Sequence, residues 1–178
     1  MSASVASAID AAAQAVGAAL RARGWTMAAA ESCTGGGVAF AVTQIAGSSA
    51  WFDRGFVTYS NDAKQQMLGV PAALIGAHGA VSEPVAAAMA AGALAHSRAH
   101  AALAITGIAG PGGATPGKPV GTVCFAWALC ADQNPRVITR THRFDGDRAA
   151  VRTQAIVFAL DGLAHALDAA PHTDAKGQ

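Results

Sequence analysis

Charged residues, aromatic residues and cysteines are all scarce in this chain of 178 residues. Only 13% of the residues are charged and the formal net charge is +1, which argues against nucleic-acid or anionic-lipid partners. The three cysteines, Cys33, Cys124 and Cys130, form no CxxC pair and no metal-ligand spacing. We therefore expect reduced thiols and a cytoplasmic location. No apolar run of about 20 residues and no signal-peptide pattern is present, so we expect no membrane segment.

A metal site is not indicated by the histidines either. Of the six, only His96 and His100 have a ligand-like spacing, and that spacing requires one continuous helix to bring both rings to one face. We expect the helix to end near Arg98, and the glutamate of an HExxH motif is missing. The sequence therefore predicts two solvated histidines, no metal and no cofactor.

Hydrophobic residues make up 52% of the chain, and many of them are alanine. This composition predicts tightly packed helices in one domain spanning residues 1–170, followed by a disordered polar tail at 171–178. A homodimer is compatible with such a composition, although no motif specifies one.

Apolar periods and breakers predict helices that alternate with strands. The expected helices span 5–23, 34–44, 62–68, 82–98 and 147–167, and the expected strands span 26–30, 55–59, 101–106, 120–130 and 136–144. Asp132 to Pro135 is the expected turn of a hairpin. The pattern predicts an α/β domain with a mixed, mostly parallel sheet and helices on both faces. In such sheets ligands bind beyond the carboxyl ends of the strands.

Nucleophilic chemistry is suggested by the segment 47–64, GSSAWFDRGFVTYSNDAK. It contains Ser48, Ser49, Tyr59 and Lys64, and the chain has no other tyrosine. A lysine in the first turn of a buried helix has a lowered pKa and can act as a base toward a hydroxyl. The alternative interpretation is that the serines cap backbone groups of a loop and that the lysine and tyrosine are ordinary surface residues at the ends of elements. The spacing does not choose between Ser48 and Ser49.

A second candidate segment is ESCTGGG, residues 31–37, at the start of an expected helix. Backbone N–H groups there favour an anion such as phosphate, although the spacing matches neither a Walker A loop nor GxGxxG. Ser32, Thr34, Gly35 and Gly36 are candidate site-lining residues. Cys33 is a weaker candidate nucleophile, because no histidine lies nearby in the sequence.

Two further features lie near the expected edge of the sheet. The loop GIAGPGGATPGKP, which begins at Gly107, is either a flexible turn or a loop whose backbone approaches a ligand. Arg148 is expected in the first turn of the last helix, which suggests either a bound anion or a surface pair with Asp145 or Asp147.

Five segments together resemble the CinA C-terminal domain family, and they cover nearly the whole domain in the family's order. They are AESCTGGG (30–37), AGSSAWFDRGFVTYSNDAK (46–64), HGAVSEPVA (78–86), ITGIAGPGGATPGKPVGTV (105–123) and FDGDRAAVR (144–152). The resemblance implies a three-layer α/β/α sandwich and hydrolysis of nicotinamide mononucleotide to nicotinate mononucleotide and ammonia, in pyridine nucleotide recycling. Longer family members carry an additional N-terminal domain linked to pyrophosphatase activity, which we do not expect in this chain.

The resemblance also implies roles for individual residues. The family's pattern accepts alanine at the first serine, which makes Ser49 the expected nucleophile, with Tyr59 and Lys64 as its activating pair. Backbone N–H groups near Ser49 or at Gly35 and Gly36 are expected to hold the oxyanion. The expected substrate contacts are Ser32, Thr34, Gly35, Gly36, Ser48, Gly107 and Arg148, the last of these to a phosphate. Ser48, Ser32 and Cys33 remain alternative nucleophiles.

Two rival functions differ in class. Tyrosine followed by lysine resembles short-chain dehydrogenases, but those use YxxxK, and Tyr59 and Lys64 have four residues between them. No TGxxxGxG fingerprint precedes the pair. The other rival is a competence-associated domain that binds a nucleotide or a protein without catalysis. The presence of serine, tyrosine and lysine together argues against that reading.

Overall fold

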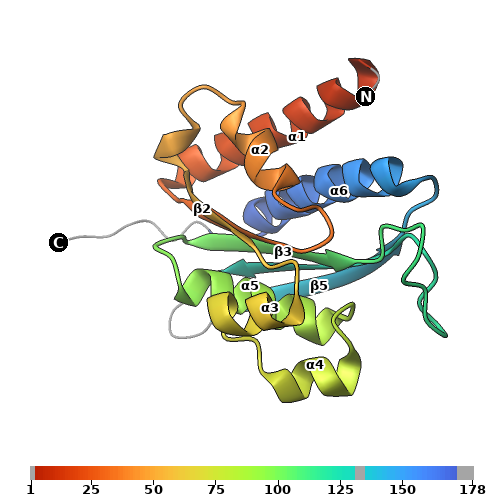
Figure 1. Ribbon diagram of the computed structural model, residues 1–178. Coiled ribbons are helices and arrows are strands. Elements are labelled where there is room, and N and C mark those ends of the chain that lie inside the picture. The colour runs from red at the N-terminus through yellow and green to blue at the C-terminus, as the bar shows by residue number, and fades with distance from the viewer. Residues whose placement is uncertain (1–2, 131–134, 172–178) are drawn as a thin grey trace.

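The computed structural model describes residues 3–130 and 135–171, in which one five-stranded sheet lies between two layers of helices (Figure 1). The strands are β1 (Met27–Glu31), β2 (Phe52–Val57), β3 (Ala101–Gly107), β4 (Thr122–Leu129) and β5 (Arg136–Arg143). The helices are α1 (Ala3–Arg23), α2 (Gly37–Thr43), α3 (Asn61–Leu68), α4 (Ala72–His78), α5 (Glu83–Ala95) and α6 (Arg148–Asp168), with a 3-10 turn η1 (Ser48–Ala50) before β2.

The strand order is β2-β1-β3-β4-β5. β1 pairs in parallel with both β2 and β3, whereas β4 is antiparallel to both β3 and β5. Four strands therefore run in one direction and only β4 runs in the other. Helices α1, α2 and α6 cover one face, and α3, α4 and α5 lie on the other (Figure 1). This arrangement confirms the predicted three-layer α/β/α sandwich with a mixed, mostly parallel sheet.

The two faces of the sheet carry side chains of very different size. Toward α1 and α6, the central strands present large groups, among them Leu103, Phe125 and Trp127. Toward α5, the same strands present mainly alanine: Ala28, Ala30, Ala102, Ala104, Ala126 and Ala128. All of these side chains are buried, as expected for strands covered on both faces. The alanine face allows α5, itself rich in alanine, to pack close to the strands.

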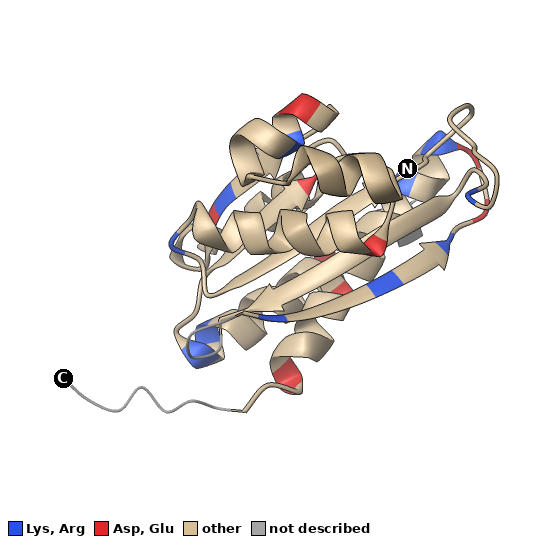
Figure 2. Cartoon of the chain, turned by 90° about the horizontal axis from the view of Figure 1, so that it is seen from below, with Lys and Arg blue, Asp and Glu red and all other residues tan. Residues whose placement is uncertain are grey.

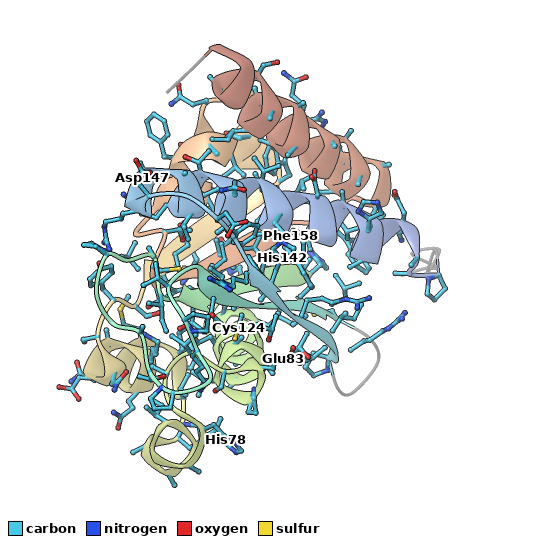
Figure 3. All side chains as sticks on the ribbon, turned by 90° about the vertical axis from the view of Figure 1, so that its right-hand side faces the viewer. His78, Glu83, Cys124, His142, Asp147 and Phe158 are labelled. Carbon is cyan, nitrogen blue, oxygen red and sulfur yellow. The ribbon has the colours of Figure 1, made fainter. Side chains whose placement is uncertain are left out.

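Helix starts follow their capping residues. Ser60 caps α3 by accepting a hydrogen bond from Ala63 N, and Ser82 caps α5, which has a proline in its first turn. The carboxylate of Asp147 accepts from Ala150 N at the start of α6 (Figure 3). These three helices begin within one residue of the predicted starts at 62, 82 and 147.

Two predicted boundaries differ from the structure in ways that affect the site. β2 begins at Phe52 and ends at Val57, three and two residues earlier than the predicted strand 55–59. Helix α4 was not predicted, because its seven residues offer too short a period and no polar cap. The predicted hairpin does join β4 to β5 as antiparallel neighbours. Most of its turn (131–134) and most of the predicted tail (172–178) lie outside the described residues.

Neither a membrane-crossing helix nor a metal cluster is found in the described ranges. No helix there is long and apolar enough to span a bilayer, and no three metal-ligating side chains lie together. His96 ends α5 and its ring contacts Gly92 O, whereas His100 lies beyond the helix, with its ring nitrogen 3.1 Å from Thr26 N. The two rings therefore do not form the shared helical face that a metal pair requires.

Candidate active site

Ser32 and Lys64 form a buried pair at the carboxyl ends of β1 and β2. The distance between Ser32 Oγ and Lys64 Nζ is 3.0 Å. Ser32 directly follows β1, and its N–H donates to Ile105 O of the neighbouring strand β3. Lys64 lies in the first turn of α3, as predicted. The topology thus joins a hydroxyl and an amine that are 32 residues apart in the sequence.

Burial favours the neutral form of Lys64. Its side chain is only 2% exposed, and desolvation lowers the pKa of its ammonium group, with a small opposing effect from the Cys33 sulfur. Its second hydrogen bond goes to a neutral acceptor, Thr58 O, at 2.9 Å. In the described part of the chain, no carboxylate lies within 4.0 Å of Nζ. Such a lysine can accept a proton from the serine hydroxyl that it contacts.

Glu31 organises the loop between β1 and α2. Its carboxylate is 1% exposed and accepts four hydrogen bonds, all at 2.7–3.1 Å. The donors are Thr34 Oγ1 and the backbone N–H groups of Gly36, Val38 and Ala39. Because the N-cap residue of α2 is Gly36, which has no side chain, Glu31 caps this helix from the end of the strand. One carboxylate therefore ties the loop to both elements.

Ser32 belongs to the ESCTGGG loop. Several groups of this loop that were predicted to contact the substrate make hydrogen bonds within the protein instead. Thr34 is fully buried and its hydroxyl donates to Glu31, so this side chain is engaged within the protein. The N–H of Gly35 donates to Ser32 O, and that of Gly36 donates to Glu31. Neither is free to hold an oxyanion. Both glycines have positive φ, 59° and 94°, which accounts for their place in this tight turn.

Cys33 is a poor nucleophile in this environment. Burial raises the pKa of its thiol to about 12, so the reactive thiolate is scarce at neutral pH. Arg152 and the protonated form of Lys64 favour the thiolate, but desolvation outweighs them. The geometry therefore favours the Ser32 hydroxyl over the adjacent thiol.

The predicted pairing of Ser49 with Lys64 is not found, because the two residues lie beyond opposite ends of strand β2. Ser48 and Ser49 lie in η1, before β2. Trp51, which follows η1, accepts a hydrogen bond at its backbone oxygen from Met27 N at the start of β1. Ser32 follows the other end of β1, about 15 Å away at ~3.3 Å per strand residue. Both serines therefore lie before the amino end of β2, whereas Lys64 follows its carboxyl end. The hydrogen-bond partners of Lys64 Nζ are Ser32 Oγ and Thr58 O, and neither Ser48 nor Ser49 is among them.

Tyr59 and Arg148 meet at the mouth of the site. Arg148 Nη2 donates to the Tyr59 hydroxyl at 2.8 Å, and Nη1 donates to Gly110 O at 2.9 Å. The arginine thus joins α6 to the segment after β2 and to the glycine-rich loop. Tyr59 is 60% exposed, unlike the buried Lys64. Arg148 does not pair with Asp145 or Asp147 within 4.0 Å; the sole ion pair among the described residues is Arg54 with Asp53.

Gly107 ends β3 beside the same loop. A Cβ atom there would lie 3.1 Å from Cys33 Sγ and 2.8 Å from Val123 Cγ2, so the absence of a side chain allows close packing. The glycine-rich loop that follows is attached on its other side by Lys118 Nζ, which donates to His78 O. Gly107 therefore supports the wall of the site by its small size.

Two apolar hollows lie away from these residues, between α6 and its neighbours. One, of about 410 Å³, is lined by Trp127, Ile138 and Phe158 among others, and the second, of about 350 Å³, shares Phe158 with it. In Figure 3, Phe158 lies beside His142, and their rings are stacked 5.1 Å apart. Neither hollow includes a candidate catalytic group. Charged residues are scattered over several elements and are not gathered on the face that Figure 2 shows.

Two residues beside the site were not predicted from the sequence: Glu31, which holds the loop, and Arg152. Arg152 lies one helical turn after Arg148, and its Nη2 donates to Thr34 O at 2.8 Å. The available signal for Glu31 was an acid directly after four residues of a fully buried strand. Buried carboxylates need several donors, and the glycine-rich turn behind Glu31 supplies backbone N–H groups.

Comparisons with known proteins agree with this architecture. A model of the CinA C-terminal domain family matches residues 9–167. The nicotinamide-nucleotide amidohydrolase PncC of Escherichia coli (strain K12) is 59% identical over 148 residues, 83% of this chain and 88% of that protein. PncC of Pseudomonas putida is 55% identical over 134 residues, 75% of this chain and 81% of that protein.

A solved structure extends the similarity to three dimensions. The crystal structure of competence/damage inducible protein CihA from Agrobacterium tumefaciens has a TM-score of 0.84 and 46% identity, covering 90% of this chain and 96% of that one. The family match covers most of the chain, and the sequence identity and the fold both agree with it. The chain belongs to the CinA C-terminal domain family.

Proposed function

We propose that this protein is an amidohydrolase that converts nicotinamide mononucleotide to nicotinate mononucleotide and ammonia, with Ser32 as nucleophile and Lys64 as base. The observation that carries the proposal is the 3.0 Å contact between Ser32 Oγ and a buried lysine whose pKa is lowered by desolvation. The names of the PncC relatives, at 55–59% identity, supply the substrate. The product is a pyridine nucleotide, which is consistent with a role in NAD recycling.

The reaction follows from these two groups. Neutral Lys64 takes the proton of Ser32 Oγ, and the oxygen forms a bond to the carboxamide carbon while the C=O electron pair moves onto the carbonyl oxygen. Collapse of this tetrahedral intermediate breaks the C–N bond, and Lys64 returns its proton to the departing nitrogen, releasing ammonia. Water, deprotonated by the same amine, then hydrolyses the acyl-enzyme. The positively charged pyridine ring withdraws electrons and makes the carbonyl carbon more reactive.

In this proposal the substrate phosphate is bound by Arg148 at the mouth of the site. Arg148 offers a guanidinium group held by neutral partners, Gly110 O and the Tyr59 hydroxyl, so its charge is available for a phosphate. Remote binding of the phosphate orients the carboxamide toward Ser32. In this proposal Tyr59 positions Arg148, whereas the sequence analysis had assigned it to proton transfer.

The test is ammonia release from nicotinamide mononucleotide in the presence of a chelator, by wild type, Ser32→Ala and Ser49→Ala. We expect Ser32→Ala to lower kcat by about 1,000-fold or more. Ser49→Ala is the same substitution at the amino end of β2, and its kcat should stay within about twofold of wild type. Activity in Ser32→Ala would contradict the nucleophile. Absence of ammonia release by wild type, together with intact nucleotide binding, would instead support a non-catalytic binding domain.

A further inference from the structure

We propose that the backbone N–H of Cys33 is the donor that stabilises the oxyanion formed when Ser32 attacks the carboxamide. The inference rests on the proposed function, and it adds a catalytic group that the side chains alone do not reveal. It depends on how each N–H group around Ser32 is used.

Almost every backbone N–H in this loop already has an acceptor. Ser32 donates to Ile105 O, Gly35 to Ser32 O and Gly37 to Thr34 O, at 2.9–3.2 Å. The N–H groups of Gly36, Val38 and Ala39 all donate to Glu31. Within the described residues, only Cys33 and Thr34 have no backbone or carboxylate acceptor between Ser32 and Ala39. Buried N–H groups nearly always have a partner, so two unused donors beside a nucleophile indicate a place for a ligand oxygen.

Cys33 is the better placed of the two. Thr34 is fully buried, whereas Cys33 retains 6% exposure and directly follows Ser32. The sulfur of Cys33 itself interacts with that N–H, but thiol sulfur is a weak acceptor that an oxyanion displaces readily. An N–H one residue after the nucleophile lies within a few ångströms of the carbon that the serine attacks, which is the placement that acyl-transfer sites require.

The charges around Cys33 favour a negative group at this position. Lys64 and Arg152 both lower the pKa of its thiol, while Glu31 acts in the opposite direction. A developing oxyanion would experience the same two cations without having to be fully buried itself. Lys64 is also protonated at the moment when the oxyanion exists, because it has just accepted the serine proton.

Glu31 is the positioning residue in this arrangement. By accepting from Gly36, Val38 and Ala39, it holds the turn in which the N–H of Cys33 has no backbone or carboxylate acceptor. A Glu31→Gln variant keeps the shape but replaces one acceptor by an NH2 group that faces N–H donors. We expect it to lower kcat more than it raises KM, since ground-state binding by Arg148 is untouched. A change in KM alone would contradict a role in positioning the oxyanion donor.

The direct test replaces a single amide by an ester, which removes one N–H. Residue 33 is introduced as lactic acid and compared with Cys33→Ala, which has the same side chain; the ester removes the N–H of residue 33 and also weakens Ser32 O as the acceptor of Gly35 N. Loss of one oxyanion donor lowers kcat by about 100-fold in comparable sites, and we expect a decrease of that order with KM nearly constant. The matched control is lactic acid at Ala86, whose N–H donates to Ser82 O in α5, and which should lower Tm without lowering kcat.

Each outcome separates the two proposals. If wild type releases ammonia and Ser32→Ala does not, but the ester at residue 33 has the kcat of Cys33→Ala, the oxyanion assignment is wrong and the proposed function stands. If wild type releases no ammonia, the proposed function fails first.

A second measurement on wild type covers the case in which the ester variant does not fold. The probe is 3-pyridylboronic acid, whose boron becomes tetrahedral when a serine oxygen adds to it. We expect the Cys33 amide proton to shift downfield more than its neighbours on adduct formation, and not in Ser32→Ala. An adduct that leaves this proton unmoved would overturn the inference, and failure of any adduct to form would count against Ser32 itself.

Discussion

In the proposed mechanism, the buried amine of Lys64 takes the role of base that a histidine has in many serine hydrolases. A lysine in water holds its proton until about pH 10.4, and it cannot then act as a base near neutrality. In this protein the amine is 2% exposed and its partners are a hydroxyl and a carbonyl, neither of which stabilises the charged form as a carboxylate would. The enzyme would obtain a base from desolvation, at some cost to the stability of the fold.

That cost predicts a dependence of stability on pH. The folded-state pKa of Lys64 lies below that of an unfolded lysine, so between the two values the unfolded chain holds a proton that the folded chain has lost. The free energy of unfolding therefore rises with pH across this window. We expect the difference in Tm between wild type and Lys64→Met to shift in favour of wild type from pH 7 to pH 10. Calorimetry on both proteins checks this, and a difference that is constant or moves in the opposite direction would contradict a depressed pKa.

Activity should depend on the same group. As pH rises through the lowered pKa of Lys64, kcat/KM for nicotinamide mononucleotide should increase, since the free enzyme then carries the neutral amine. Lys64→Arg keeps the charge and cannot lose its proton below pH 12, so we expect it to be inactive throughout. An active arginine variant would show that proton transfer does not pass through this side chain.

Tyr59 and Arg148 differ in what their loss should change. Tyr59→Phe removes a hydroxyl that only holds Arg148, and we expect kcat to fall by less than about tenfold. Arg148→Met removes the charge proposed to bind phosphate and should raise KM by about 10- to 100-fold. Steady-state kinetics on the two variants distinguishes the roles. A loss of kcat in Tyr59→Phe as large as that of Ser32→Ala would restore the tyrosine to proton transfer.

The close packing of α3, which carries Lys64, against α5 depends on a single glycine of α5. A Cβ atom on Gly92 of α5 would lie 2.1 Å from Leu68 O at the end of α3. Gly92→Ala should therefore destabilise the fold by about 1–3 kcal/mol and displace α3. Gly76 of α4 has nothing within 4 Å of the same point, and Gly76→Ala should stabilise by roughly 0.5–1 kcal/mol.

Denaturant unfolding of the two variants tests this pair. The same substitution in two helices is expected to have opposite signs, so a general effect of alanine is excluded. We also expect ammonia release to fall in Gly92→Ala at temperatures where it remains folded, because α3 positions the base. Equal stability changes in both variants would show that α3 and α5 do not pack as closely as described.

Much of the architecture was predictable because it rests on local signals. The caps at Ser60, Ser82 and Asp147 mark three helix starts, and the buried strands 101–106 and 120–130 were found within two residues. The start of β2 was not predicted, because Phe52 to Arg54 do not alternate between apolar and polar residues. Their place in the sheet depends on pairing with β1, which lies more than 20 residues away in the sequence. The expected pairing of Ser49 with Lys64 came from the resemblance to the family and not from the position of this strand.

The site was only partly predictable for a similar reason. Position along the chain places Lys64 at a helix start and Ser32 after a strand, but their 3.0 Å contact depends on two parallel strands of matched register. Glu31 could not be assigned its role from sequence, because its four donors become neighbours only when the glycine turn folds back onto α2.

The molecule as a whole joins distant segments at one edge of its sheet. Arg148 connects α6 to Tyr59 and to the glycine-rich loop, and Lys118 fixes that loop to α4. Segments from both helical layers thus contribute to the mouth of the site, while Ser32 and Lys64 lie beneath it. In the proposed function these internal hydrogen bonds hold Arg148 in place for the substrate phosphate.

The alanine face of the sheet has a consequence for how this protein can change over evolution. α5 lies against Ala28, Ala102, Ala126 and their neighbours, and α3 lies against Gly92 of α5. Each added methyl group on that face would move α5 outward, and with it α3 and the amine that reaches Ser32. Side chains far from Ser32 therefore help to set its distance from Lys64, and under the proposed mechanism substitutions at these buried positions would change kcat as well as stability.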